Sequence, residues 1–304
     1  MERARVAGRN AFFVWVGGLA LVGCGSSAAE PDLVLAERLT TTEGDADYDC
    51  LGTETAPGPE DPITFEVQFE DLFAGPVGER GMPGEVCFSF YPDNGLPASD
   101  SCTDSGMTAT PSPTSDQFST AEVTDPDGGW FALRSYPDDT NLGVIAKNAF
   151  SGPSGSAQVF ASFKPSTADE VTQGFGHARD PDTAAFYGVV RDCSGRPVQG
   201  AETRVLLDGE VVLDSDASEG PFYGYFTDSA ESEPDPSLEN VRRVWFAGNI
   251  PMDAETATVV ACGNVDGMPT VIGCEEIRMY SQSVHRITLG PVRADGPSCP
   301  NICE

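Results

Sequence analysis

The chain has few basic residues. Its 304 residues include 17 Lys and Arg against 48 Asp and Glu, so the formal net charge is −31. Lysine occurs only twice, at Lys147 and Lys164. Every contact to a phosphate needs Lys or Arg to neutralise it, so this acidity repels nucleic acid and anionic membrane surfaces. The composition excludes binding of nucleic acid. It favours a well-solvated surface, cationic partners and loose association with divalent ions.

Catalytic and metal-binding signatures are also missing. The sequence holds no G-x-S-x-G elbow, no P-loop, no H-E-x-x-H and no C-x-x-C pair. Histidine occurs only at His177 and His285, too few for an ordinary zinc site. The DPDG run at residues 125–128 superficially suggests calcium. It lacks the later ligands of an EF-hand loop, and a β-turn is the better interpretation. We therefore expect no catalytic residue, no metal site and no cofactor.

The apolar run near the N-terminus is too short to cross a membrane. Residues 11–22 are apolar apart from two glycines, and about 12 residues fall short of the roughly 20 that a transmembrane helix needs. Three arginines precede this run, at Arg3, Arg5 and Arg9. A positive segment followed by a short apolar one is typical of an export signal.

The LVGC run at residues 21–24 resembles a bacterial lipobox, in which a signal peptidase cuts before an acylated cysteine. The resemblance implies that residues 1–23 are removed and that Cys24 carries lipid. The alternatives are an ordinary secretory signal with an incidental cysteine and, less favoured, a cytosolic core helix. Gly25 and Ser26 follow Cys24 where inner-membrane retention favours Asp, so we expect a lipid-anchored protein of the cell envelope, at the outer membrane.

The cysteine count supports this interpretation. Nine is an odd number for an exported protein, but a lipid on Cys24 leaves eight cysteines that can close four disulfides. We expect two local pairs, Cys87 with Cys102 and Cys262 with Cys274, because each pair brackets a turn-prone segment. The partners of the other four stay open: Cys50, Cys193, Cys299 and Cys303. A zinc site is the rival interpretation of these cysteines.

The remaining sequence predicts an all-β protein. Residues 24–61 are rich in Thr, Glu, Asp, Gly and Pro and predict an acidic flexible tether. Apolar alternation at 63–70, a second strand at 158–163 and frequent turn clusters predict short strands. We expect a linker at 166–184, a single helical turn at 237–243 and a C-terminal tail with two cysteines at 291–304.

An internal repeat organises the predicted strands. Phe65 and Asp71 recur as Phe186 and Asp192, each 121 residues later. The WFA run at 130–132 recurs at 245–247, and VIA at 144–146 recurs as VVA at 259–261. Chance similarity between strand residues is the alternative. We expect two copies of one β-domain, at residues 62–165 and 185–290.

The repeat carries short family motifs. The second copy opens with YGVVRD at 187–192 and GRPVQGA at 195–201, and the first copy carries TDPDGGWF at 124–131. In these motifs the chain resembles the carboxypeptidase regulatory-like family, a transthyretin-like β-sandwich. The resemblance implies two tandem immunoglobulin-like or prealbumin-like sandwiches that act as structural or binding appendages without catalytic residues.

The two histidines do not complete a zinc peptidase site. In the HARD run at 177–180, Asp180 stands where a zinc carboxypeptidase has a glutamate. His285 alternates with Ile287 and Leu289, so we expect a half-buried structural histidine.

We therefore expect a membrane-anchored, non-enzymatic lipoprotein, a tandem β-sandwich that scaffolds or binds an unknown protein or glycan partner. The candidate partner contacts are the aromatic residues Phe222, Tyr223 and Tyr225, for which a buried role at a strand edge is an equal alternative. The alternative functions are a calcium-stabilised adhesion or carbohydrate-binding module and a hydrolase of unrecognised type.

Overall fold

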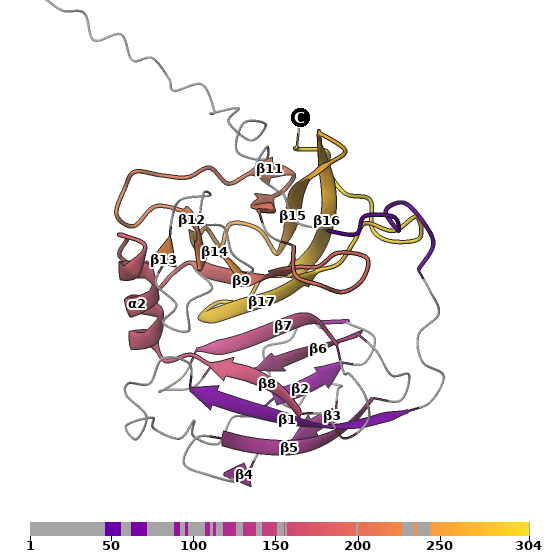
Figure 1. Ribbon diagram of the computed structural model, residues 1–304. Helices are drawn as coiled ribbons and strands as arrows, with labels where there is room; N and C mark the ends of the chain where they lie inside the picture. Colours follow the sequence, from indigo (N-terminus) through magenta and orange to yellow (C-terminus); the bar gives the residue numbers. More distant parts are fainter. Residues whose placement is uncertain are drawn as a thin grey trace, which may run out of the picture. The chain divides into compact units, whose positions relative to one another are not determined.

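The computed structural model describes residues 46–55, 62–71, 88–91, 95–96, 107–109, 112–113, 118–125, 130–137, 142–150, 155, 157–198, 200–226, 234–235 and 244–303 (Figure 1). All of them belong to the same structural unit, Leu33–Glu304. The expected leader, the Cys87–Cys102 pair, the DPDG turn and the helical turn at 237–243 fall wholly or partly outside these residues.

The first eight strands form two sheets, and we call them the first strand set. One sheet has the order β4-β5-β1-β8, and the other strands follow one another as β3-β2-β6-β7. The bounds of the strands are β1 (Ile63–Asp71), β2 (Phe88–Tyr91), β3 (Met107–Ala109), β4 (Ser112–Pro113), β5 (Phe118–Asp125), β6 (Trp130–Ser135), β7 (Gly143–Phe150) and β8 (Ala157–Ser162).

The later strands form a second strand set after helix α2 (Pro165–Gly174). Its sheets have the orders β13-β12-β14-β9-β17 and β11-β10-β15-β16. The bounds are β9 (Ala184–Val190), β10 (Glu202–Leu207), β11 (Glu210–Val211), β12 (Phe222–Phe226), β13 (Pro234–Asp235), β14 (Val244–Ile250), β15 (Thr256–Val265), β16 (Met268–Arg278) and β17 (Ser283–Leu289). The all-β, sandwich-like fold expected from the sequence is therefore confirmed.

The two strand sets share one topology. β1 lies between an antiparallel β5 and a parallel β8, and β9 lies between an antiparallel β14 and a parallel β17. The orders β3-β2-β6-β7 and β11-β10-β15-β16 also correspond. The repeat is present in the fold, and Phe65 and Phe186 lie on equivalent first strands.

The other sequence matches of the repeat are displaced by one strand. By topology β6 corresponds to β15, whereas the WFA match equates β6 with β14. Likewise β7 corresponds to β16 by topology, whereas the match of VIA at 144–146 with VVA at 259–261 equates β7 with β15. These two equivalences were wrong because buried strands of either sheet have similar apolar residues, and the residues do not record which sheet a strand joins.

A single pair of strands joins the two sets into one sheet. β17 runs parallel to β7, in register from Ser283 opposite Gly143 to Ile287 opposite Lys147. The joined sheet has nine strands, in the order β13-β12-β14-β9-β17-β7-β6-β2-β3. Figure 1 shows β7 and β17 side by side at this junction. The two sets are therefore connected by backbone hydrogen bonds as well as by the chain.

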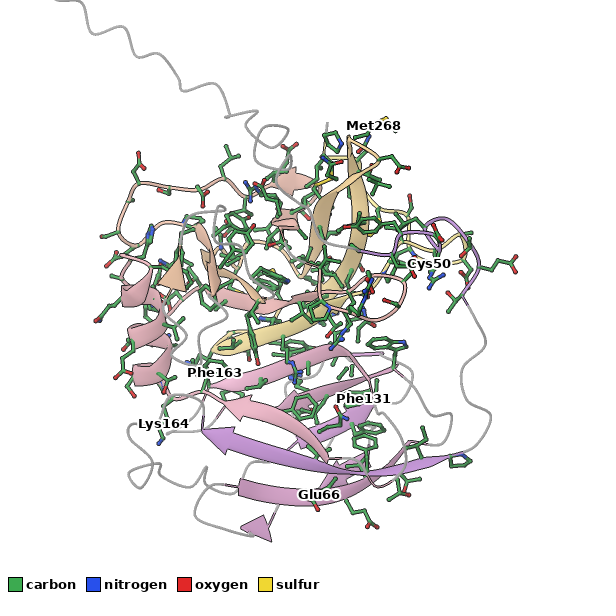
Figure 2. All side chains as sticks on the ribbon, in the orientation of Figure 1. Cys50, Glu66, Phe131, Phe163, Lys164 and Met268 are labelled. Carbon is green, nitrogen blue, oxygen red and sulfur yellow. A yellow bond between two sulfur atoms is a disulfide. The ribbon has the colours of Figure 1, made fainter. Side chains whose placement is uncertain are left out.

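Each strand set has its own apolar core. In the first set, the ring of Phe131 lies 5.1 Å from that of Phe65 and 4.9 Å from that of Phe90, measured between centroids. Figure 2 labels Phe131 among the strands of this set. The second core includes Trp245, Phe186 and residues of β15 and β17. Burial of these large side chains from both sheets provides the main stabilisation of each sandwich.

α2 lies where the sequence predicted only a linker. Pro165 begins the helix, a position that tolerates proline because no partner exists there for its missing N–H. Val171 of the helix and Phe175 after it pack against Phe222 and Phe246 of the second set. The helix therefore covers the face of β12 and β14 that the core leaves open.

A polar cluster is buried where the two sets meet. Arg134 of β6 is 2% exposed, and its guanidinium lies 3.6 Å from the ring centre of Tyr280 and 4.6 Å from that of Tyr136. His285 of β17 stacks on Phe186 at 4.7 Å. A buried cation between aromatic rings is a cation–π arrangement, which stabilises the charge.

His285 is fully buried, where the sequence predicted half-burial, because β17 is a central strand with both faces covered. The backbone N–H of Tyr280 donates to Nε2 at 3.4 Å, so Nδ1 carries the proton and donates to the carbonyl oxygen of Ala185 at 3.3 Å. Burial lowers the pKa of His285 to about 4, and the positive charge of Arg134 acts in the same direction. The imidazole is therefore neutral near pH 7.

Within the residues that the structure describes, no helix has both the length and the apolar character needed to cross a membrane.

Candidate functional site

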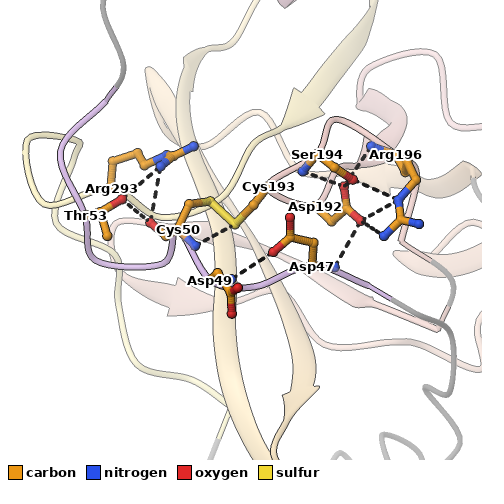
Figure 3. The surroundings of a disulfide bond; sticks show 9 residues. All are labelled: Asp47, Asp49, Cys50, Thr53, Asp192, Cys193, Ser194, Arg196 and Arg293. Carbon is orange, nitrogen blue, oxygen red and sulfur yellow. Dashed lines mark hydrogen bonds and ion pairs between the residues drawn. A yellow bond between two sulfur atoms is a disulfide. The ribbon is translucent and has the colours of Figure 1, made fainter.

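The segment 46–55 is bound to the second strand set before the chain reaches β1. A disulfide joins its Cys50 to Cys193, in the turn after β9, with 5.6 Å between the two Cα atoms (Figure 3). The two cysteines are 143 residues apart in the sequence. This part of the predicted flexible tether is thus covalently fixed, and we call residues 46–55 the clamp segment.

Asp192 anchors the clamp segment from the turn beside the disulfide. Its carboxylate accepts hydrogen bonds from the backbone N–H groups of Asp47 at 3.1 Å, Ser194 at 3.0 Å and Arg196 at 2.8 Å. The Arg196 guanidinium forms an ion pair with it at 3.0 Å. Burial would raise the pKa of Asp192, but these donors outweigh burial and lower the pKa to about 2. The carboxylate is therefore ionised at any physiological pH.

The C-terminal segment holds the clamp segment on its other side. Arg293 Nη1 donates to the Thr53 hydroxyl at 3.0 Å and to the Cys50 carbonyl at 3.3 Å. The backbone N–H of Gly52 donates to the carbonyl of Val292 at 2.9 Å. Figure 3 shows Arg293 and Asp192 on opposite sides of the disulfide. The clamp segment is therefore held by the β9–β10 turn and by the chain after β17 together.

Two further disulfides fasten the C-terminal tail to the second strand set. Cys262 of β15 pairs with Cys303, and Cys274 of β16 pairs with Cys299. The predicted Cys262–Cys274 pair was wrong. In the β15–β16 ladder Cys274 lies opposite Val260, and Cys262 lies opposite Val271, so the two cysteines are out of register.

These three disulfides of the described residues attach both ends of the described chain to one strand set. Both ends of the described chain, the clamp segment and the tail, are covalently attached to the second strand set. All eight strands of the first set lie between Cys50 and Cys193. Disulfides persist in oxidising compartments, so the protein has the character of an extracytoplasmic one.

A groove of about 330 Å³ lies beside the clamp, where both strand sets contribute residues. Trp130 and Asn148 come from the first set, Arg191 and Thr288 from the second, and Arg293 from the C-terminal segment. Trp130 is 45% exposed. The sequence analysis missed these residues. An aromatic residue directly after a polar turn, at the start of β6, was the available signal for Trp130.

One ion pair and one hydrogen bond cross between the strand sets beside the groove. Lys147 Nζ of β7 lies 2.6 Å from one carboxylate oxygen of Glu275, and Asn148 Nδ2 donates to the other at 2.6 Å. Asn148 has a left-handed backbone with φ of 55°, which Asn tolerates better than most residues. Glu275 therefore links β16 to two successive residues of β7.

The aromatic residues predicted as exposed partner contacts lie inside the second strand set. Phe222 and Tyr225 are buried in β12, and Tyr223 is half-buried. The Tyr223 hydroxyl accepts from the backbone N–H of Val205 at 3.1 Å and donates to the carbonyl of Val212 at 2.8 Å. Of the two roles that the sequence left open for these residues, the structure shows the buried one, because β12 is covered by the core on one face and by the chain around Phe175 on the other.

The two histidines have structural surroundings. His177 is half-buried and stacks on Phe222 with 4.3 Å between ring centres. His285 lies in the buried cluster described above. Across the described ranges, no group of three His, Cys, Asp or Glu side chains could hold a metal ion.

The fold defines an all-β protein with two sandwich-like strand sets of the same topology. No protein-family model matches the sequence, and no curated protein matches it. Among solved structures, a streptococcal ancillary pilin is similar with a TM-score of 0.18 and 10% identity, over 77% of this chain and 69% of the pilin chain. A likeness this weak carries no functional argument, so the function has to be inferred from the chain's own residues.

Proposed function

We propose that the protein is a non-enzymatic lipoprotein of the cell envelope, a scaffold that is anchored through lipid on Cys24 and binds a partner through its two sandwiches. The observation that carries this proposal is the Cys50–Cys193 disulfide. A protein that is anchored through its N-terminus is pulled at the segment that leads to the anchor. A disulfide between that segment and the folded second strand set keeps the segment attached under such a pull.

The connection defines how tension from such an anchor would be transmitted. A pull on the chain before residue 46 reaches Cys50 and passes through its disulfide to Cys193 in the second strand set. Because the first strand set lies inside the loop that this disulfide closes, the pull bypasses it. The first set would then keep its fold while the second set carries the load.

The sequence supports the anchor, and the shared topology supports the type of module. The LVGC run at 21–24 resembles a lipobox, and Gly25 and Ser26 favour the outer membrane. Two strand sets with one strand order are what two carboxypeptidase regulatory-like modules would form.

The anchor is tested by the mass of the mature N-terminus and by cell fractionation. We expect a chain that begins at a diacylated or triacylated Cys24 and sediments with membranes. Cys24→Ser should lose the lipid mass and leave the membrane fraction, whereas Cys50→Ser, the matched control, should keep both. A mature chain that begins at another residue, or a membrane-bound Cys24→Ser variant, would refute the anchor. Protease shaving of intact cells then assigns the face of the membrane.

A further inference from the structure

The groove beside the clamp is built from rigid parts. Its walls include the Cys50–Cys193 and Cys274–Cys299 disulfides, through Cys193, Cys274 and Cys299. Thr288, which also lines it, belongs to β17, a central strand of the nine-stranded sheet. A groove whose walls are already ordered loses little conformational entropy when a ligand binds, which favours affinity.

Trp130 provides a flat apolar surface at this groove. It is the only exposed residue of β6, whose other five residues are buried. An indole that is 45% exposed at the start of an otherwise buried strand leaves a large part of its apolar surface in contact with solvent. The negative face of an aromatic ring attracts C–H groups that carry partial positive charge, as those on the face of a sugar ring do.

Two arginines in the groove are held in place by hydrogen bonds to backbone carbonyls and, for Arg293, also to a hydroxyl. Arg191 Nη1 donates to the carbonyl of Gly195 at 2.5 Å, and Arg293 is held by Cys50 and Thr53 as described above. Each guanidinium has five N–H donors, so these bonds leave donors for a ligand. A fixed guanidinium loses less freedom on binding than a mobile one and matches the geometry of a carboxylate.

The acidic groups of the groove are already paired. Asp192 forms its ion pair with Arg196, and Glu275 forms its own with Lys147. The groove therefore presents the positive charge of Arg191, together with Arg293, whose charge also acts on the nearby carboxylate of Asp295, in a chain whose net charge is −31. This local charge favours an anionic group on the ligand.

Thr288 supplies a second polar observation. Its side chain lines the groove and is only 6% exposed. No hydrogen bond of its hydroxyl to another residue occurs in the part of the chain that the structure describes. Because Thr288 lines the groove and its hydroxyl has no such partner, the hydroxyl is available to bond water or a ligand there.

We propose that this groove binds a saccharide that carries a carboxylate, such as a uronic acid unit. Trp130 stacks on the C–H face of the ring, Arg191 and Arg293 bind the carboxylate, and the Thr288 hydroxyl bonds a sugar hydroxyl. A flat aromatic ring beside fixed guanidinium and hydroxyl groups matches the apolar face and polar rim of a sugar. The inference rests on the proposed function as a binding module and names its ligand class.

The test uses the full-length oxidised protein in detergent, with galacturonic acid trimers and neutral galactose trimers as probes. Binding is measured by calorimetry and by tryptophan emission, in which buried Trp245 serves as an internal reference. We expect the acidic trimer to bind at least tenfold more tightly than the neutral one and to change the emission of Trp130.

Variants separate the roles of the groove residues. Trp130→Ala should weaken binding of both trimers at least tenfold. Arg191→Gln should remove the preference for the acidic trimer, and Thr288→Val, which keeps the side-chain shape, should weaken both trimers severalfold. Arg278→Gln is the matched control because Arg278 pairs with Glu255 and does not line the groove, and it should bind as the unaltered protein does.

Three results would overturn the inference: no binding of either trimer, equal binding of both, or tighter binding of an aspartate-rich peptide of the same charge. Unchanged melting temperature and intact disulfide mass in each variant show that a loss of binding is not a loss of fold. None of these results depends on Cys24, so failure of the ligand and failure of the lipid anchor are distinguishable.

Discussion

Cys50 and Cys193 are joined by a disulfide across 143 residues, and every strand of the first set lies between them. The first strand set therefore lies within a loop that this disulfide closes onto the second strand set. Together with the tail disulfides, this bond means that both ends of the described chain are fastened to the same strand set. Five predictions concern this arrangement, the groups around it and the buried His285.

Removal of the Cys50–Cys193 disulfide should destabilise the protein more than removal of Cys274–Cys299. In the chain-entropy model a loop of 143 residues contributes about 5 kcal/mol, and one of 25 residues about 3.5 kcal/mol. Each pair is replaced by Ser at both positions, and the free energy of unfolding is measured in denaturant. A smaller loss for the Cys50 pair would show that loop closure is not its main contribution.

The same bond should control how the protein lengthens under force. When an oxidised chain is pulled from residue 46 and from its C-terminus, unfolding of the first strand set should add no length. After Cys50→Ser and Cys193→Ser it should add about 360 Å, at roughly 3.6 Å for each of the about 100 residues from the start of β1 to the end of β8. Single-molecule force spectroscopy measures this difference. The paired Cys274→Ser and Cys299→Ser variant is the control, and a step of about 360 Å in the oxidised parent would contradict the load path.

Loss of the Asp192 carboxylate should release the clamp segment. Asp192→Asn removes an ionised acceptor with several donors, and we expect a loss of about 2 kcal/mol in the free energy of unfolding. Backbone amides of residues 46–55 should exchange faster with deuterium. Asp295→Asn, at an exposed carboxylate that binds Thr55, is the matched control and should have a smaller effect. Unchanged exchange in Asp192→Asn would show that the disulfide holds the segment without Asp192.

The pKa of Asp192 also makes the clamp sensitive to acid. A carboxyl whose pKa is about 2 when folded and 3.8 when unfolded contributes stability above pH 3.8. That contribution is lost as the pH falls from 3.8 towards 2. Asp192→Asn should therefore flatten this part of the stability profile.

His285 should make the protein less stable in mild acid. Its pKa is about 4 when folded and 6.5 when unfolded, so between these values the unfolded chain binds the extra proton. Stability therefore falls as the pH decreases from 6.5 towards 4, by a total on the order of 3 kcal/mol. Denaturant unfolding at several pH values measures this slope. His285→Gln should reduce the slope, whereas His177→Gln should keep it.

Much of the fold follows from local patterns in the sequence. Apolar alternation with frequent turns predicted an all-β protein, and β1 shows the expected pattern, with Ile63, Phe65 and Val67 buried and Glu66 exposed. The odd cysteine number predicted disulfides once Cys24 was set aside. The repeat was visible in Phe65 and Phe186, because equivalent first strands fill equivalent cores.

Local patterns in the sequence could not predict which cysteines pair or which residues form the groove. Cys262 and Cys274 are close in sequence, but the β15–β16 register separates them and the tail supplies both partners. A fragment limited to the predicted domains, residues 62–290, would therefore leave Cys193, Cys262 and Cys274 unpaired. The groove was also invisible, because its residues come from both strand sets and the C-terminal segment.

The sequence by itself determined the net charge, the β character and the number of cysteines of this protein. Charge and cysteine number are sums over residues, and strand-forming periodicity is set within a few neighbouring residues. The tertiary structure decided which cysteines pair, which aromatic residues are exposed and where the two strand sets join. Those outcomes depend on strand register and on contacts between residues more than a hundred positions apart, such as Cys50 with Cys193 and Gly143 with Ser283. Phe222 and Trp130 illustrate the difference, since both are aromatic residues beside turns and only the packing of neighbouring elements buries one and exposes the other.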